Sequence, residues 1–431
     1  MELTTNGEND NPITNRLKKI VLITSGMPAL NPRLVKEADA LWDAGYEVTV
    51  LYTYWNDWGA ALNKQLLAEK KWTAIQAGGD PDEKPFVYLL SRLVHKVAKL
   101  LAEKTGRYSY FANTAIARSS FFLTREAKKH PADLYIAHNL GALSAAVKAA
   151  KHFEKPCGFD AEDFHRQETD DDTNSYHYRM ATFIEDKYLP LVNYLTASSP
   201  LIAERYARLY KRTIPSILNV FPKTEQLKVV NNIDKPIQLF WFSQNLGPKR
   251  GLEIIIEALG LTKTSFNLHL LGNVSPQYKE QLLQLAQSKE VDTACIYFYP
   301  PLKADEIFGF AARFDIGLAS ETGFCLNNNI ALSNKLFTYI QSGLAVVASN
   351  TPAQSALISQ YPQIGKTYKN AAELAAVLPA YAKDRSLLNR TKKEAWETGQ
   401  AVLNWDIECH KFLDIVENVL TASQHENHPK K

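Results

Sequence analysis

Lys18-Lys19-Ile20-Val21-Leu22-Ile23-Thr24-Ser25-Gly26 is a short apolar run that ends in small polar residues. Such a run is typical of a buried parallel strand that leads into a loop. Apolar residues at helical spacing follow from Leu34 to Leu41, Gly45 stands where a helix would stop, and a second apolar run begins at Val48. The stretch therefore predicts a β-α-β unit.

Outward from this unit, strand and helix patterns alternate to residue 197 and start again after residue 236. A chain of 431 residues exceeds the roughly 250–300 residues at which single cores stop growing. The pattern predicts an α/β protein with two Rossmann-like domains. We expect a tail at 1–17, an N-terminal domain at 18–222, a linker at 223–236, a C-terminal domain at 237–403, a helix at 404–422 that packs back on the N-terminal domain, and a tail at 423–431.

Composition narrows the class of protein. Hydrophobic residues make up 45% and charged residues 22%, as in globular proteins. A net charge of +3 is too small for a nucleic-acid-binding protein. We find no signal peptide and no apolar run long enough to span a membrane, so we expect a cytoplasmic protein. A reducing compartment suits the four widely spaced cysteines, which are Cys157, Cys295, Cys325 and Cys409.

One loop of the second domain has the composition of a phosphate site. Gly247-Pro248-Lys249-Arg250-Gly251 follows an expected strand at 237–242 and opens a helix. Ligands of open α/β sheets bind at the carboxyl ends of the strands, and helix N-termini attract anions. The loop therefore suits a diphosphate, although the two cations could also be surface charges on an ordinary turn.

A second loop strengthens the first interpretation. Glu321-Thr322-Gly323-Phe324 follows another expected strand, and Ser333 to Gly343 then opens a further helix at the same sheet edge. Two helix N-termini would converge on one anion.

Here the sequence resembles the family-4 glycosyltransferases of the GT-B fold. Their segment "NKLFEY…aaGlpVvas" is matched by residues 334–349, and their opening by residues 31–38 and 45–48. Further similar strings are Ala137-His138-Asn139, Asp160-Ala161-Glu162-Asp163, Ser198-Ser199-Pro200 and Ile217-Leu218-Asn219-Val220.

The resemblance implies two Rossmann-like domains that face a central cleft. It implies metal-independent transfer of a sugar from a nucleotide-sugar to a glycan or lipid-linked acceptor, with retention of configuration and no cofactor, in polysaccharide or glycoconjugate synthesis. A sugar-nucleotide epimerase, a phosphorylase or a catalytically silent sugar-binding partner are the alternatives, because a fold does not determine a reaction.

The resemblance also implies a donor site. Arg250 would be the cation on the leaving diphosphate, with Lys249 beside it. Thr338 stands where the family has a ribose-binding glutamate, and Ile330 is likewise not the paired glutamate. The expected donor-binding residues are Gln244, Asn245, Gly247, Glu321, Gly323, Phe324, Asn334, Lys335 and Thr338.

On the acceptor side, the resemblance places His138 beside the donor sugar, although a lone histidine at a strand end is more often structural. Glu162 or Asp163 would orient the acceptor hydroxyl, or cap the next segment. Ser25, Gly26 and Arg33 are expected in the cleft, with a surface position as the alternative for Arg33.

Two other interpretations are rejected. Asp170-Asp171-Asp172 resembles a metal-binding DxD element, but it lies in a polar stretch ahead of a helix, where acidic residues are usually solvated. The turn after the first strand lacks the GxGxxG spacing of a nicotinamide dehydrogenase.

Residues 86–129 are rich in Lys and Arg, with interleaved aromatic residues. One interpretation has helices whose aromatic side packs on the sheet while the basic side meets water, which is the commoner arrangement. The other is peripheral contact with an anionic membrane at its inner face, or binding of a lipid-linked acceptor. The residues are Arg92, Lys96, Lys99, Lys104, Arg107, Arg118, Arg125 and Lys128, with Tyr88, Tyr108, Tyr110, Phe111, Phe121 and Phe122.

Overall fold

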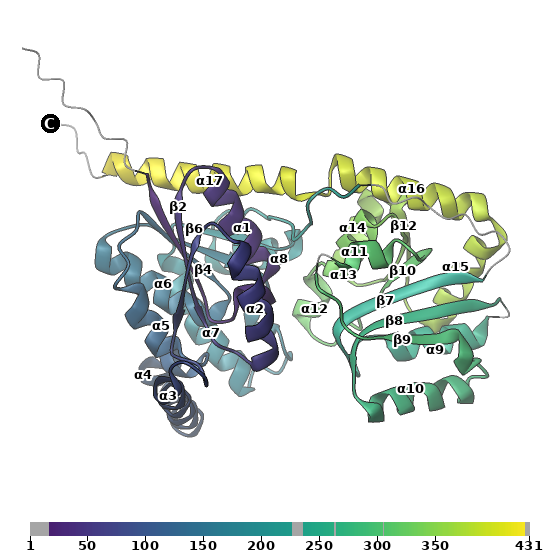
Figure 1. Cartoon of the computed structure of the whole chain (residues 1–431), viewed down its shortest axis with the longest axis horizontal. Helices are drawn as coiled ribbons and strands as arrows, with labels where there is room; N and C mark the ends of the chain where they lie inside the picture. The colour runs from purple at the N-terminus through teal and green to yellow at the C-terminus, as the bar shows by residue number, and fades with distance from the viewer. Residues whose placement is uncertain (1–16, 226–235, 263, 305, 427–431) are drawn as a thin grey trace, which may run out of the picture.

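The computed structural model describes residues 17–225, 236–262, 264–304 and 306–426. They form two α/β domains side by side, with α16 (Arg385–Ala401) along the C-terminal domain and α17 (Trp405–Glu426) along the N-terminal domain (Figure 1). Most of the expected linker and of the two expected tails lies outside the described residues.

The N-terminal domain has a six-stranded parallel sheet in the order β3-β2-β1-β4-β5-β6, which is the Rossmann order. Its strands are β1 (Lys19–Thr24), β2 (Glu47–Thr53), β3 (Thr73–Ala77), β4 (Leu134–His138), β5 (Cys157–Ala161) and β6 (Tyr194–Ala197). Its helices are α1 (Pro32–Asp43), α2 (Asp57–Glu69), α3 (Pro85–Thr105), α4 (Tyr108–Ala115), α5 (Ser120–Ala127), α6 (Leu140–Phe153), α7 (Tyr176–Tyr188) and α8 (Pro200–Tyr210).

The C-terminal domain repeats this topology in the order β12-β11-β10-β7-β8-β9, again parallel. Its strands are β7 (Ile237–Leu246), β8 (Phe266–Val274), β9 (Ile296–Tyr299), β10 (Ile316–Ala319), β11 (Ala345–Ser349) and β12 (Gly365–Tyr368). Its helices are α9 (Leu252–Leu261), α10 (Pro276–Ser288), α11 (Glu306–Ala311), α12 (Leu326–Ile330), α13 (Asn334–Gln341), α14 (Pro352–Gln360) and α15 (Ala371–Lys383). The expected fold class is confirmed.

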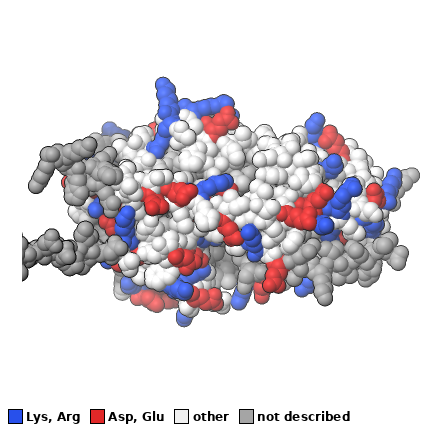
Figure 2. Space-filling view, turned by 90° about the horizontal axis from the view of Figure 1, so that it is seen from above, with Lys and Arg blue, Asp and Glu red and all other residues white. Residues whose placement is uncertain are grey.

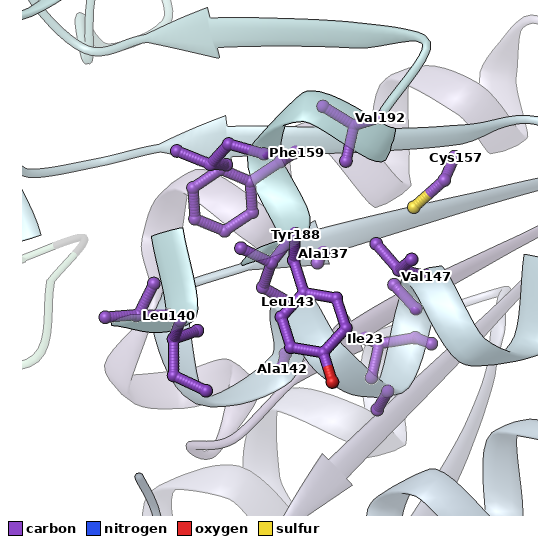
Figure 3. Close-up of a cluster of buried hydrophobic side chains, with 14 of the residues drawn as sticks. Ile23, Ala137, Leu140, Ala142, Leu143, Val147, Cys157, Phe159, Tyr188 and Val192 are labelled. Atoms are coloured by element: carbon purple, nitrogen blue, oxygen red, sulfur yellow. The ribbon is translucent and has the colours of Figure 1, made fainter. Parts of the chain in front are cut away.

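The core of the N-terminal domain surrounds α6, which is apolar on nearly every side and buried along most of its length. A helix of that pattern has no face for solvent, so it lies inside. Leu143 and Val147 of α6 lie in one cluster with Ile23 of β1 and Phe159 of β5 (Figure 3).

The last helix belongs to the N-terminal domain by its packing. Trp405, Phe412 and Val416 of α17 are buried in the cluster that contains Leu34 and Leu41 of α1. Helix α17 thus returns the end of the chain to the first domain, as the fold class predicts.

The strand that leads to the phosphate loop is longer than expected. We predicted a strand that ends at Phe242, but β7 continues to Leu246 beside β8, with an irregular register between Phe242 and Asn245. Burial of Leu246 holds this extension in place. Gln244 and Asn245 are therefore exposed strand residues and not loop residues.

No helix in the described part of the chain is long and apolar enough to cross a membrane. All four cysteines are free thiols.

Candidate functional site

The turn from Gly247 to Gly251 carries the two cations expected to bind phosphate. Lys249 and Arg250 are exposed, and among the described residues neither has a carboxylate within ion-pair distance. Gly251 has a φ of 79°, and a Cβ there would lie 2.7 Å from that of Ser320. Only glycine lets the backbone approach the next loop this closely. The turn thus leaves two unpaired cations at the N-terminus of α9.

The loop after β10 is bonded to this turn. Ser320 Oγ donates to the Arg250 carbonyl at 2.9 Å and accepts from Trp241 Nε1 at 2.8 Å. Thr322 Oγ1 donates to the Lys249 carbonyl at 3.0 Å. The two loops predicted separately from the sequence therefore form one surface.

Gly323 and Phe324 lie at the open end of this surface. Gly323 has a φ of 66° and its N–H donates to Asn328 Oδ1 at 2.7 Å. Phe324 is 46% exposed, and Lys249 Nζ lies 6.0 Å from the centre of its ring. An exposed ring beside a cation leaves room for a polar ligand to contact both.

Glu321 joins the N-terminus of α13 to the same loop. Lys335 Nζ lies 2.8 Å from Glu321 Oε1, and Asn328 Nδ2 donates to Glu321 Oε2 at 3.0 Å. Burial favours the neutral acid, but the charge of Lys335 and these hydrogen bonds lower the pKa of Glu321 overall. Lys335 is thus neutralised by Glu321, and a phosphate role for Lys335 remains a prediction.

Thr338 and Ile330, which replace the family's paired glutamates, both lie out of solvent. The Thr338 hydroxyl donates to the Asn334 carbonyl at 3.1 Å within its own helix, and the residue is 2% exposed. Ile330 packs into the hydrophobic cluster of the N-terminal domain. In this conformation neither side chain is presented to a ribose.

Helix α12 connects the domains through polar contacts. Asn327 Nδ2 donates to Asp163 Oδ1 at 2.7 Å, and the N–H of Phe164 donates to Asn327 Oδ1 at 2.8 Å. The N–H of Leu326 donates to Asp171 Oδ1 at 2.8 Å. Burial, followed by the nearby charge of Glu168, raises the pKa of Asp163 to about 6. Asp163 and Asp171, the middle residue of the aspartate run, thus lie at the domain contact.

Arg33 is buried, which excludes the alternative position on the surface, and its expected place in the cleft stays a prediction. Its Nη2 donates to Asp160 Oδ1 at 2.7 Å, and its Nε donates to Oδ2 of the same carboxylate. The pair is 1% exposed on both sides. Two parallel bonds of this kind give a carboxylate and a guanidinium their strongest arrangement.

His138 completes this cluster and is also fully buried. Its Nε2 lies 3.1 Å from Glu37 Oε2, but the contact lacks hydrogen-bond alignment. Burial disfavours the imidazolium, yet Glu37, Glu162 and Asp160 together raise the pKa of His138 to about 10. Burial and Asp160 raise the pKa of Glu37. The cluster therefore holds His138 as a cation, and its contact with a donor sugar remains a prediction.

Glu162 is the accessible edge of the cluster. Its side chain is 25% exposed, and Oε1 lies 3.4 Å from His138 Nδ1 and accepts from Asn31 Nδ2 at 2.5 Å. Nearby, Ser25 Oγ donates to Asn139 Oδ1 at 2.6 Å, and the Gly26 N–H donates to Thr24 Oγ1 at 3.2 Å. Glu162 is thus better placed than His138 to meet a ligand from solvent.

The cluster poorly suits a metal ion. Glu37, His138 and Asp160 each offer one atom within 4.8 Å of the others. However, the Arg33 guanidinium binds Asp160 and lies 3.6 Å from Glu37 Oε1. A divalent cation there would face a fixed positive charge.

Glu37, Asp160, Ser320 and Asn327 are among the residues of these networks that were not predicted from the sequence as functional residues. Glu37 follows Arg33 by one helical turn, a spacing that could have suggested their pairing. Asp160 was quoted only as part of a motif. Ser320 and Asn327 carry no sequence signal, because their partners are distant in the chain.

Comparisons with known proteins identify the fold. No protein-family model matches the chain, and no curated protein matches its sequence. The structure of HepE from Anabaena in complex with UDP has a TM-score of 0.65 at 16% identity, with 93% of this chain and 100% of HepE covered. A glycosyltransferase from Rickettsia africae gives 0.63 at 16% identity, with 94% and 99% covered. Sucrose-phosphate synthase from Thermosynechococcus elongatus gives 0.63 at 14% identity, with 94% and 100% covered.

Proposed function

The chain has the GT-B fold, and we propose that it transfers a sugar from a nucleotide-sugar to a glycan or lipid-linked acceptor with retention of configuration. The observation that carries the proposal is the joined surface of the two loops. It places the unpaired Lys249 and Arg250 at the N-terminus of α9, against the loop that leads to α13. A diphosphate is the ligand that such a surface suits.

The proposed reaction depends on stabilising the leaving group. The bond between the anomeric carbon and the diphosphate oxygen breaks, and the acceptor oxygen forms a bond to the same carbon from the same face. The acceptor proton passes to the departing phosphate oxygen. Arg250 and the helix N-terminus are preorganised for the charge that develops on the diphosphate, so they lower the barrier without reorganising.

The donor remains to be identified. HepE has been crystallised with UDP and with UDP-glucose, which makes UDP-sugars the first donors to test. The burial of Thr338 away from solvent favours recognition of the nucleotide by backbone groups or by residues other than the family's glutamate.

The full chain should be incubated with a panel of UDP-, GDP-, ADP- and dTDP-sugars, with nucleoside diphosphate release measured with and without EDTA. We expect release with at least one donor, unaffected by EDTA, and NMR of the product should show the donor's anomeric configuration.

A product with inverted anomeric configuration would exclude retention. A new sugar epimer would indicate an epimerase, phosphate-dependent release of a sugar phosphate would indicate a phosphorylase, and nucleotide binding without turnover would indicate the silent partner.

A further inference from the structure

Helix α3 exposes large apolar side chains along its whole length. Phe86 is 86% exposed and Leu93 is 59% exposed. The full stripe is Phe86, Leu89, Leu90, Leu93, Val97, Leu100 and Leu101. At about 100° per residue, these positions fall within an arc of roughly 120° on the helix. They form one continuous stripe, which we call the α3 stripe.

The opposite side of α3 holds small residues. Ser91, Ala98 and Ala102 are buried, and the two alanines belong to the core of the N-terminal domain. A soluble helix normally turns its large apolar residues inward and its polar ones outward. Here the orientation is reversed, because the large apolar side chains point outward and the fully buried positions of α3 are Ser91, Ala98 and Ala102.

For residues 86–129, the commoner arrangement was helices whose aromatic side packs on the sheet while the basic side meets water. It holds for part of this segment. Tyr108 and Phe111 of α4 pack against the core of the N-terminal domain, as that interpretation predicts. It fails for α3, and the neighbouring helices add Tyr110, 77% exposed, and Phe121, 44% exposed. The exposed apolar area is therefore too extended to be scattered surface residues.

Cations border the α3 stripe. Arg92, Lys96 and Lys99 are exposed along one flank, and Lys104 ends the helix. Residues 84–129 contain ten Lys and Arg but only two acids, Glu103 and Glu126. By contrast, Lys and Arg are interspersed with Asp and Glu on the face that carries α16 and α17 (Figure 2). Helix α3 lies at the opposite end of the N-terminal domain from α17 (Figure 1).

We propose that the α3 stripe lies in the interface of an anionic lipid bilayer. An apolar face flanked by Lys and Arg is the pattern of an interfacial helix, in which aliphatic side chains enter the acyl boundary while cations contact headgroup phosphates. The cations favour an anionic membrane as the partner of the α3 stripe, since a purely apolar partner would not require Lys and Arg beside it. This proposal does not depend on donor use.

Flotation of the full chain with vesicles tests the proposal, and no nucleotide is needed. We expect binding to phosphatidylcholine vesicles that contain phosphatidylglycerol, weaker binding at high salt, and little binding to phosphatidylcholine alone. The double variant Leu93→Ser/Val97→Ser should bind at least about tenfold more weakly, because two side chains lose their apolar burial. Lys96→Gln/Lys99→Gln should lose about fivefold per cation.

Leu261→Ser is the matched control, because Leu261 is 63% exposed on α9 in the other domain. It should float like the unmodified chain, and all variants should keep the melting temperature, since the changed side chains are exposed. Failure of the unmodified chain to bind either vesicle would overturn the proposal, as would unchanged binding of Leu93→Ser/Val97→Ser. Self-association without vesicles that this variant abolishes would instead assign the α3 stripe to a second copy of the chain.

Discussion

Two sets of charged residues, one in each domain, lie in opposite environments. In the N-terminal domain, Arg33, His138 and Asp160 are buried and contact one another. In the C-terminal domain, Lys249 and Arg250 are exposed and have no carboxylate partner among the described residues. A buried charge that loses its partner destabilises the domain, whereas an exposed unpaired cation in a fixed turn is available for an anionic ligand. We therefore expect a structural role for the buried charges and a binding role for Lys249 and Arg250.

The largest expected effect comes from breaking the buried pair. Asp160→Asn keeps the shape of the side chain but removes the carboxylate charge that the Arg33 guanidinium binds through two hydrogen bonds. We expect the N-terminal domain to lose about 3–5 kcal/mol of stability, because an uncompensated charge stays buried. Hydrogen exchange of β4 and β5 would measure it, since a two-domain protein need not unfold in one step.

Lys249→Ala is the control for that measurement, and it should change stability by less than about 0.5 kcal/mol because its side chain is exposed. If Asp160→Asn were equally mild, the cluster would not be structural and the contrast between the domains would fail.

The next largest effect is expected on the rate of sugar transfer. Arg250→Ala should raise the barrier to sugar transfer by about 2–4 kcal/mol, as removal of one preorganised electrostatic donor does. This corresponds to a loss of roughly 30- to 1,000-fold in rate with the preferred donor. Stability should change little, because the Arg250 side chain is exposed and its Nη1 donates one hydrogen bond, to the Ser243 hydroxyl at 2.8 Å.

Lys366→Ala is the matched control, because it removes one exposed cation from the edge strand β12 of the same domain. If both variants retained normal turnover, the leaving group would not depend on Arg250. If both lost it equally, net charge and not position would be responsible.

One histidine in each domain, His138 and His269, is expected to contribute to stability with opposite pH dependence. The carboxylates around His138 raise its pKa to about 10 against burial, so its stabilising contribution is complete below about pH 6.5 and is lost as pH rises through 10. His269 lies between Tyr297 and Phe314, where burial lowers its pKa to about 4. Its contribution is present above about pH 6.5 and is lost as pH falls through 4.

Stability relative to the unmodified chain, measured by local hydrogen exchange across this pH range, checks both signs. The loss caused by His138→Gln should be on the order of 3 kcal/mol near pH 6 and should shrink toward pH 10. The loss caused by His269→Gln should be of similar or smaller size near pH 7 and should shrink toward pH 4. If the stability losses of both variants changed in the same direction with pH, the environments of His138 and His269 would not shift the two pKa values in opposite directions.

The smallest effect is expected at Thr338. Its hydroxyl is bonded within α13, so Thr338→Val should change nucleotide affinity by no more than about twofold, well below the 1.4 kcal/mol of a tenfold change. Calorimetry with the preferred nucleoside diphosphate would measure it. A loss above tenfold would mean that the hydroxyl turns to the ligand on binding.

Several elements could be predicted because local pattern and tertiary environment agree. The buried run at residues 20–23 is β1, and the mostly apolar helix that we expected around residues 142–152 is α6. The strands β3 and β12 were missed because their sequences, Thr-Ala-Ile-Gln-Ala and Gly-Lys-Thr-Tyr, contain no continuous apolar run. The extension of β7 to Leu246 also escaped prediction, because it depends on pairing with β8.

By itself, the sequence determined the α/β class, the two Rossmann-like halves, and the loops that bear Lys249, Arg250 and Glu321, because apolar periodicity and glycine positions act over a few residues. Only the tertiary structure decided which charged side chains form ion pairs and which stay available to a ligand. Whether Arg33 meets solvent or Asp160, and whether the leucines of α3 face the core or the outside, depends on residues far away in the chain. Burial and Coulomb interactions are set by distance in space, which no local pattern records.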